Sequence, residues 1–353
     1  MAKQLSSIVM NSVNVENLRE LILYSIDQDE NFGDYVAIKK VNHGDPIGFI
    51  GDMNAIGKKG SGCDPVFDDI SIKNGLKRWA LGDWQAPMKL CYEDLVNTVA
   101  EYCLRKGTDI ADITEVDFTT DILLPRIDRA LKQMIIRIGW FGDTDAKTIA
   151  NGGTLTNGTD TSLFTTCDGL WKRIFTQGAA NSKQLTEIAA NAKTTAADQK
   201  AEMLKKGVAT DLVDKILMDA DSRIIDDPDA MLLMTRAMSD ALAYDLKKVH
   251  NLIMPWEKVF DGIEVSTYGG VKVARMSVFD RNISAFENTG TKLNKPYRAV
   301  FANKEQLMVG CPADDIISTP RVWYENKERR LYVDIQGKLG TSLREDDMFH
   351  AAY

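Results

Sequence analysis

The chain has 353 residues, of which 44% are hydrophobic and 27% are charged. This composition supplies enough apolar side chains for a packed core, so it excludes a chain that is disordered throughout. The net charge of -8 at pH 7 argues against a surface built to wrap nucleic-acid phosphates, although it leaves room for local basic patches.

The cysteines and histidines show no spacing typical of a metal site or of a closed disulfide framework. They are Cys63, Cys91, Cys103, Cys167 and Cys311, with His43, His250 and His350. An odd number of cysteines without a CxxC pair indicates free thiols in a reducing compartment. The N-terminal residues do not look like a signal peptide, and no apolar run of about eighteen residues occurs. We therefore expect synthesis in the cytosol and no membrane partner.

The first part of the chain predicts few compact elements. Residues 14–26 predict a short amphipathic helix. Residues 35–90 predict a long extended excursion, with two strand arms on either side of a glycine-rich tip at residues 57–62. The stretch from Asn42 to Lys73 holds too few large apolar residues to bury itself. Since an isolated two-stranded ribbon is marginal in water, a neighbouring subunit is expected to cover it.

A long amphipathic helix is predicted over residues 121–145, after a shorter helix over residues 92–106. Its apolar residues recur at gaps of three and four, which is typical of one continuous stripe. They are Leu124, Ile127, Leu131, Met134, Ile138 and Phe141. Pro125 should lie near the helix start, and Gly142 should end the helix as a left-handed residue. The helix would be about 30 Å long.

Further helices are predicted in the middle of the chain, beginning with a packed element at Asp168. Residues 181–206 predict a solvated helix or a pair of helices, and residues 211–220 predict another. Residues 228–248 predict a helix with a stripe of apolar side chains along one side. This stripe consists of Met231, Met234, Met238, Leu242 and Leu246.

Strands are predicted from Ile263 onward. Residues 263–279 predict two strands around a Gly-Gly turn, and residues 296–311 predict a strand, a polar turn and a second strand. Residues 321–340 predict a hairpin with a charged turn at residues 326–329. With helices mostly early and strands mostly late, the pattern indicates a mixed α+β protein.

No residues in the sequence form a recognisable catalytic, cofactor-binding or metal site. The glycine-rich runs at residues 57–62 and 149–160 lack the spacing of a phosphate-binding loop, so we interpret both as surface loops. Asp219, Asp221, Asp226, Asp227 and Asp229 could be a weak divalent-cation site, but helix capping is the preferred interpretation. We predict that the protein is not an enzyme.

The order of elements resembles that of tailed-phage major capsid proteins with the HK97-like fold. Residues 77–95 look like the strand that returns from the extended loop of that family, and residues 118–145 look like its spine helix, which ends in Gly-Asp. Other matching segments are residues 165–174, 231–248, 269–279, 296–315 and 332–349. The resemblance covers nearly the whole chain.

The resemblance implies an α+β chain divided into an arm, a loop and two domains. The divisions are an N-terminal arm (1–34), the extended loop and its strands (35–90), a peripheral domain with the spine helix (91–165), an axial domain (166–319) and a return to the peripheral domain (320–353). It also implies copies arranged as hexamers and pentamers in an icosahedral head that encloses phage DNA without sequence specificity.

The same resemblance implies partners and a location. A portal is expected, and because the N-terminal arm is short, a separate scaffolding protein, or none, is implied, with the separate protein as the expected case. Decoration proteins are further candidate partners. The protein would be made in the bacterial host cytoplasm and would end in the virion.

Two other interpretations remain open from the sequence. The first is an encapsulin-like cellular compartment, which keeps the fold but encloses a cargo enzyme. The second is an α+β enzyme whose site shows no recognisable motif. Particle size separates the second from the others, because an enzyme would be a small oligomer and a shell would be a particle of megadalton mass.

Overall fold

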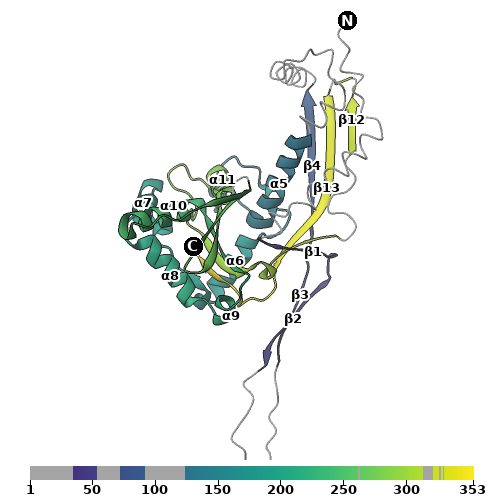
Figure 1. Cartoon of the computed structure of the whole chain (residues 1–353). Coiled ribbons are helices and arrows are strands. Elements are labelled where there is room, and N and C mark those ends of the chain that lie inside the picture. The colour runs from purple at the N-terminus through teal and green to yellow at the C-terminus, as the bar shows by residue number, and fades with distance from the viewer. Residues whose placement is uncertain are drawn as a thin grey trace, which may run out of the picture.

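The computed structural model describes residues 35–53, 72–91, 124–260, 263–312, 321–325, 327–328 and 330–353. The predictions for residues 14–26, 57–62 and 92–106 lie outside these ranges. The described residues form a five-stranded, a seven-stranded and a two-stranded sheet. Figure 1 shows a compact helical part, a long thin sheet that rises from it, and a two-stranded arm that projects in the opposite direction.

The predicted spine helix is present as α5 (Leu124–Phe141) and is about 27 Å long. The predicted stripe is buried, since Ile127, Leu131 and Ile138 are at most 4% exposed and Met134 is 8% exposed. These side chains share one core with residues of β4 (Gly82–Cys91) and β13 (Arg330–Leu343). The stripe prediction is therefore confirmed for the residues from Ile127 to Phe141.

Strand β13 is the longest strand among the described residues and belongs to two pairing regions. From Arg330 to Leu339 it pairs with β4, and its outer end also pairs with β12 (Arg321–Glu325). From Gly340 to Leu343 it pairs with β11 (Leu307–Cys311), which in turn pairs in parallel with β1 (Ala37–Lys40). The predicted hairpin over residues 321–340 is confirmed, and its second strand extends further than expected.

The seven-stranded sheet forms the centre of the compact part. Its strands, in spatial order, are β5 (Leu185–Thr186), β14 (His350–Ala352), β10 (Ala299–Asn303), β6 (Ala230–Thr235), β9 (Val271–Met276), β8 (Ile263–Tyr268) and β7 (Glu257–Phe260). Residues of α8 (Val208–Asp219) and α10 (Arg236–Asp245) pack in one core cluster with this sheet. Residues of α6 (Leu170–Ala180) and α11 (Ser277–Phe286) pack in the other, together with α5.

The remaining regular segments are short. They are α7 (Ala196–Met203), α9 (Ser222–Ile225), a π-helical turn at Leu246–His250, and 3-10 turns at Ile149–Asn151, Thr161–Leu163, Ser182–Gln184, Ala189–Ala192 and Lys304–Gln306.

The prediction of one helix over residues 228–248 is wrong in its first half, which is strand β6. Met231 and Leu233 belong to one core cluster, whereas Leu232 and Met234 belong to the other. Because both faces of this strand are covered, its sequence is a continuous apolar run without alternation. Such a run cannot be distinguished from a buried helix by periodicity alone.

One prediction of strand pairing is also wrong, and another is confirmed except at its end. The strands expected as a hairpin over residues 296–311 are β10 and β11, which belong to different sheets. The two strands predicted over residues 263–279 are β8 and β9, which pair antiparallel, but residues 277–279 begin α11, with Phe279 in the core. The solvated helix or pair of helices predicted over residues 181–206 is present only as α7, in which Gln199 and Met203 are the buried residues. The rest of the segment forms 3-10 turns and strand β5, and Ile188 is 4% exposed.

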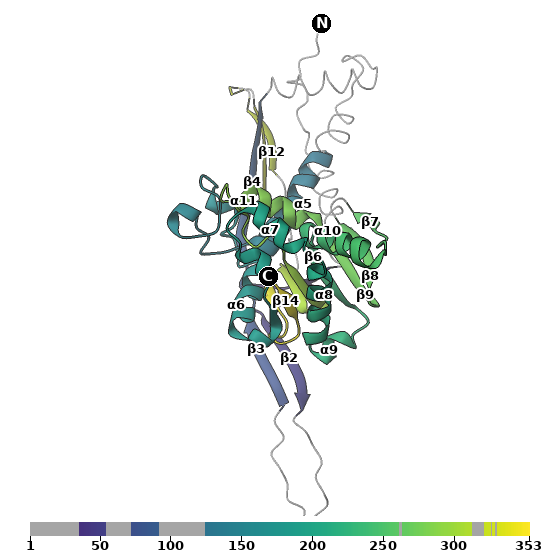
Figure 2. The same cartoon turned by 90° about the vertical axis from the view of Figure 1, so that its left-hand side faces the viewer.

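The projecting arm consists of β2 (Pro46–Met53) and β3 (Ile72–Arg78), which pair antiparallel as predicted. The Trp79 N–H donates to the Asp45 carbonyl at 3.0 Å and closes the base of the arm, and Ile47 and Trp79 pack against Ala37 and Met308 of the body. The Lys77 ammonium also donates to Asp346 Oδ1 at 2.6 Å. Above this base Leu76 is 69% exposed. Figure 2 shows the arm and the outer end of β4 at opposite ends of the molecule.

Ile138 tests the spine helix, because its side chain is 3% exposed in the core. Ile138→Asp would bury a carboxylate without a partner, so we expect it to lower the free energy of unfolding by about 3 kcal/mol or more. The exposed Gln133 of the same helix provides the matched control Gln133→Asp. Thermal and denaturant unfolding of both variants measures the difference. Equal stability would mean that the buried face of α5 is assigned incorrectly.

Candidate functional site

The end of α5 meets the start of α6 through two glycines. The Gly169 N–H donates to the Gly142 carbonyl at 2.8 Å, and the Asp143 N–H donates to the Phe164 carbonyl at 2.9 Å. A Cβ on Gly142 would lie 2.3 Å from the Cys167 carbonyl oxygen. Gly142 is not among the glycines with positive φ, so its prediction as a left-handed stop is wrong. The position requires glycine because two backbone segments approach closely there.

Three carboxylates surround one ammonium group beside this junction. Lys172 Nζ lies 2.6 Å from Asp143 Oδ1, 2.7 Å from Asp168 Oδ1 and 3.3 Å from Asp145 Oδ2. Burial opposes the charge on Lys172, but hydrogen bonds with Asp143 and Asp168 raise its pKa above the usual value. In the described part of the chain, no three His, Cys, Asp or Glu side chains could hold a metal ion. The cation at these carboxylates is Lys172 itself.

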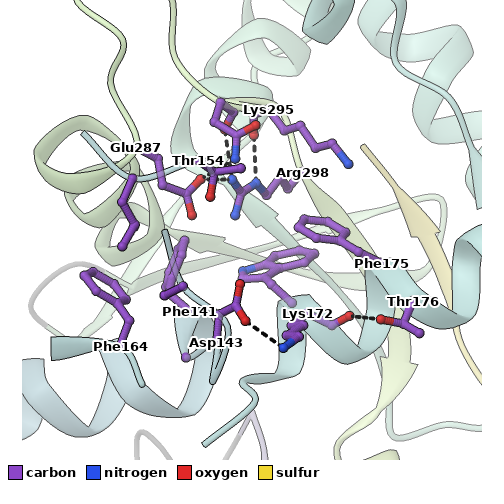
Figure 3. A pocket seen from close by; sticks show the side chains of 15 residues that line it. Phe141, Asp143, Thr154, Phe164, Lys172, Phe175, Thr176, Glu287, Lys295 and Arg298 are labelled. Atoms are coloured by element: carbon purple, nitrogen blue, oxygen red, sulfur yellow. Dashed lines mark hydrogen bonds and ion pairs between the residues drawn. The ribbon is translucent and has the colours of Figure 1, made fainter. Parts of the chain in front are cut away.

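A pocket of about 340 Å³ opens above the junction. Figure 3 shows Asp143 and Lys172 on one side of it and Glu287, Lys295 and Arg298 on the other. The residues between them are largely aromatic: Phe141, Phe164, Trp171 and Phe175. The pocket thus combines apolar walls with charged groups from segments that are far apart in the sequence.

Two of the acidic residues around Pro228 accept hydrogen bonds from backbone N–H groups. The Asp221 carboxylate accepts the Arg223 N–H at 2.9 Å at the start of α9. Asp227 accepts the Asp229 N–H at 2.9 Å. The capping interpretation is therefore confirmed for Asp221.

The second glycine-rich run also uses its backbone internally. The Ile149 N–H donates to the Leu155 carbonyl, and the Ala150 N–H donates to the Asn157 side chain, each at 2.8 Å. These two amides are consequently engaged inside the loop and do not face a phosphate. The run at residues 57–62 lies outside the described residues.

Two of the five cysteines can be assessed, and the side chains of both, Cys167 and Cys311, are buried. Burial raises the pKa of the Cys167 thiol to about 12, so this group is protonated at neutral pH and is a poor nucleophile. Cys63 and Cys103 lie outside the described residues, as does the side chain of Cys91. Within the described residues, no helix is both long enough and apolar enough to cross a bilayer.

No family model and no curated protein matches the sequence. Among solved structures, a chain of the satellite phage P4 procapsid including the size determination (Sid) protein aligns with a TM-score of 0.52 at 12% identity. The alignment covers 96% of this chain and 98% of that chain. A chain of Gordonia phage Cozz aligns with a TM-score of 0.48 at 10% identity, covering 90% and 84%. A chain of Mycobacterium phage Ogopogo aligns with a TM-score of 0.49 at 10% identity, covering 91% and 90%.

The P4 procapsid chain defines the fold of this protein, because that alignment spans nearly the whole of both chains. The α+β, HK97-like capsid fold predicted from the sequence is therefore confirmed. The sequence revealed the spine helix and its Gly142–Asp143 end, but it did not reveal the aromatic pocket beside that end. The sequence around Arg298, directly before strand Ala299–Asn303, carries no local signal for it.

Gly142→Ala should destabilise the subunit, because the new methyl group would overlap the backbone of Cys167. We expect a loss of about 1–3 kcal/mol in the free energy of unfolding, which is typical of overpacking. Gly48→Ala in β2 is the control, since no atom lies within 4 Å of its added Cβ. Chemical denaturation compares the two. An unaltered midpoint for Gly142→Ala would contradict the close approach.

Lys172→Met should lower stability at neutral pH much more than at acidic pH. Burial would raise the pKa of Asp168, but bonds from Lys172 and Thr144 hold it below its usual value. The stabilisation that these bonds give to the ionised Asp168 is therefore present above the unfolded-state pKa of an aspartate, about 4. It is lost as the pH falls through the folded-state pKa of Asp168. Because the groups are partly exposed, we expect a loss of about 1 kcal/mol at pH 7. Unfolding of the unmodified protein and of the Lys172→Met variant at several pH values from 2 to 7 measures this loss. A difference that does not shrink toward pH 2 would contradict the assignment.

Proposed function

We propose that the protein is the major capsid protein of a tailed phage and that copies of it build the head shell. The observation that carries this proposal is the β2–β3 arm, which extends away from the body of its own subunit. The shared fold with the P4 procapsid chain supports it.

The arm needs a covering surface at Leu76 that the described residues of its own subunit do not supply. A two-stranded ribbon is marginal in water, and Leu76 is 69% exposed. Burying an apolar side chain contributes about 25 cal/mol per Å² removed from water. A neighbouring copy that lies against the arm would bury this side chain. Assembly of the subunits would therefore stabilise the arm.

The outer sheet has the form of a thin wall. In β4, Trp84 is buried against the spine core, whereas Asp83, Gln85 and Lys89 are exposed. The opposite face of this sheet is thus polar, and Lys338 on β13 forms an ion pair of 3.3 Å with Asp83 across it. One helix layer on one sheet layer suits a subunit that must be broad and thin rather than globular.

We propose hexamers and pentamers as the assembly units and packaged DNA as the content, bound without sequence specificity. A portal, a separate scaffolding protein and decoration proteins are the proposed partners, and no enzymatic role is proposed. The protein would be synthesised in the bacterial cytoplasm and would be located in the virion.

The domain division is proposed in a revised form. We keep residues 1–34 as the N-terminal arm, residues 35–90 as the extended loop that includes the β2–β3 arm, and residues 91–165 as the peripheral domain with the spine helix. Within 166–319, strand β11 pairs with β13 of the outer sheet. Within 320–353, strand β14 pairs with β10 of the seven-stranded sheet. We therefore propose that the chain crosses between the domains at residues 304–306 and again after Leu343.

Replacing residues 49–75 by a short Gly-Ser turn tests the function of the arm. This replacement keeps Ile47, Lys77 and Trp79, which hold the base in the body. We expect a protein that unfolds cooperatively at nearly the same temperature as the intact chain but forms no closed particles. Calorimetry and electron microscopy measure the two properties.

Leu76→Asp provides a finer test, because it changes one exposed side chain and leaves the base intact. It should leave the unfolding temperature unchanged and reduce particle yield. Normal particles from both variants would remove the main physical argument for a shell protein. Particles of the intact chain that contain protein cargo instead of DNA would favour the encapsulin-like compartment.

A further inference from the structure

The pocket beside the α5–α6 junction contains hydrogen-bond donors without acceptors. Arg298 is 0% exposed and Trp171 is 2% exposed, and both line the pocket. Within the described ranges of the chain, Arg298 Nη1 and Trp171 Nε1 have no hydrogen-bond partner. Buried donors in native structures are almost always paired, so two unpaired donors in one pocket indicate a missing acceptor.

The guanidinium group of Arg298 is held by its own loop so that only one of its nitrogens remains unpaired. Its Nε donates to the Lys295 carbonyl at 2.8 Å, and its Nη2 donates to the Asn294 carbonyl at 2.9 Å and to Glu287. Lys295 takes the strained left-handed conformation, with φ of 43°. Strain of this kind tends to persist where the backbone must position a functional group.

Lys295 adds a positive charge that no carboxylate in the described residues neutralises at ion-pair distance. Its ammonium lies 4.0 Å from the centre of the Tyr353 ring and 4.3 Å from that of Phe175. Burial, with a smaller contribution from Arg298, lowers the pKa of Lys295 to about 8. An anion in the pocket would favour the charged form of this residue.

The other charges of the pocket are already matched. Lys172 is bound by Asp143, Asp145 and Asp168, and Glu287 accepts hydrogen bonds from Arg298 and Asn294. Among the residues that line the pocket, Lys172, Lys295 and Arg298 outnumber Asp143 and Glu287 by one positive charge, while Asp145 and Asp168 reach Lys172 from outside the lining. The lining also carries two N–H donors without acceptors and aromatic walls. A singly charged planar group fits this better than a doubly charged one, because a single negative charge balances the one excess positive charge of the lining.

We propose that this pocket binds a carboxylate attached to a small apolar body. The carboxylate accepts hydrogen bonds from Arg298 Nη1 and Trp171 Nε1 and is attracted by Lys295, while the apolar body lies against Phe141 and Phe164. The volume of about 340 Å³ falls within the range of small-molecule sites. This inference does not depend on the function as a shell protein.

Binding of phenylacetate to the full-length, unassembled subunit tests the proposal. Titration calorimetry should show saturable binding, and the melting temperature should rise with ligand concentration. Phenylacetamide has the same shape without the charge and should bind about tenfold more weakly or worse, since hydrogen bonds to a charged acceptor are the stronger ones. Inorganic phosphate is the second comparison.

Two variants assign the binding to this pocket. Trp171→Phe keeps an aromatic ring but removes the free N–H, and Lys295→Met removes the unmatched charge. Each should weaken phenylacetate binding by about fivefold or more. Lys292→Met is the matched control, because Lys292 lies in the same loop and does not line the pocket. It should leave the affinity unchanged. Melting curves without ligand verify that each variant is folded.

Three results would overturn the proposal. They are the absence of saturable phenylacetate binding, affinity for phosphate equal to that for phenylacetate, and affinity unaffected by Trp171→Phe in a folded variant. The same titration on assembled particles identifies the source of the carboxylate. Binding that is retained indicates a free small molecule, whereas binding that occurs only before assembly indicates a carboxylate supplied by a neighbouring copy.

Discussion

The two parts of this molecule depend on the register of one strand. Strand β13 pairs with β4 and β12 along its outer part and with β11 along its last residues. Its inner end is also tied to α6, because Arg173 Nε donates to Thr341 Oγ1 at 3.0 Å and Thr341 donates to the Asp168 carbonyl. A slip of one residue would turn Val333 and Ile335 from the spine core to solvent, so burial on one face holds the register.

The parts of the fold that follow a local rule were accessible from the sequence. The stripe from Ile127 to Phe141 has a helical period and one buried face, and the hairpin of β12 and β13 has a charged turn between two apolar runs. Strand β6 and helix α11 show neither a clear period with one buried face nor a polar turn that marks their ends. Strand β6 is buried on both faces, and α11 directly follows a strand without a break in apolar character.

The rest of the fold and the pocket depend on contacts between distant residues. Strands β10 and β11 are separated by a three-residue turn, yet tertiary pairing assigns them to different sheets. Phe141, Trp171 and Arg298 meet only after α5, α6 and the loop before β10 have packed together. Nothing in the spacing of these residues predicts that a guanidinium will lie over their rings, because the cause is the packing of elements and not a local propensity.

The long pairing of β4 with β13 also has a mechanical consequence. Hydrogen bonds between antiparallel strands run perpendicular to the strand axes. A pull along the strands therefore loads all the bonds from Arg330 to Leu339 at once, in shear, whereas a pull across one end would break them one after another. The outer sheet should resist stretching along its length far better than peeling at its edge. Tension along the axis of β13 is thus the direction in which one subunit carries the greatest load before it yields.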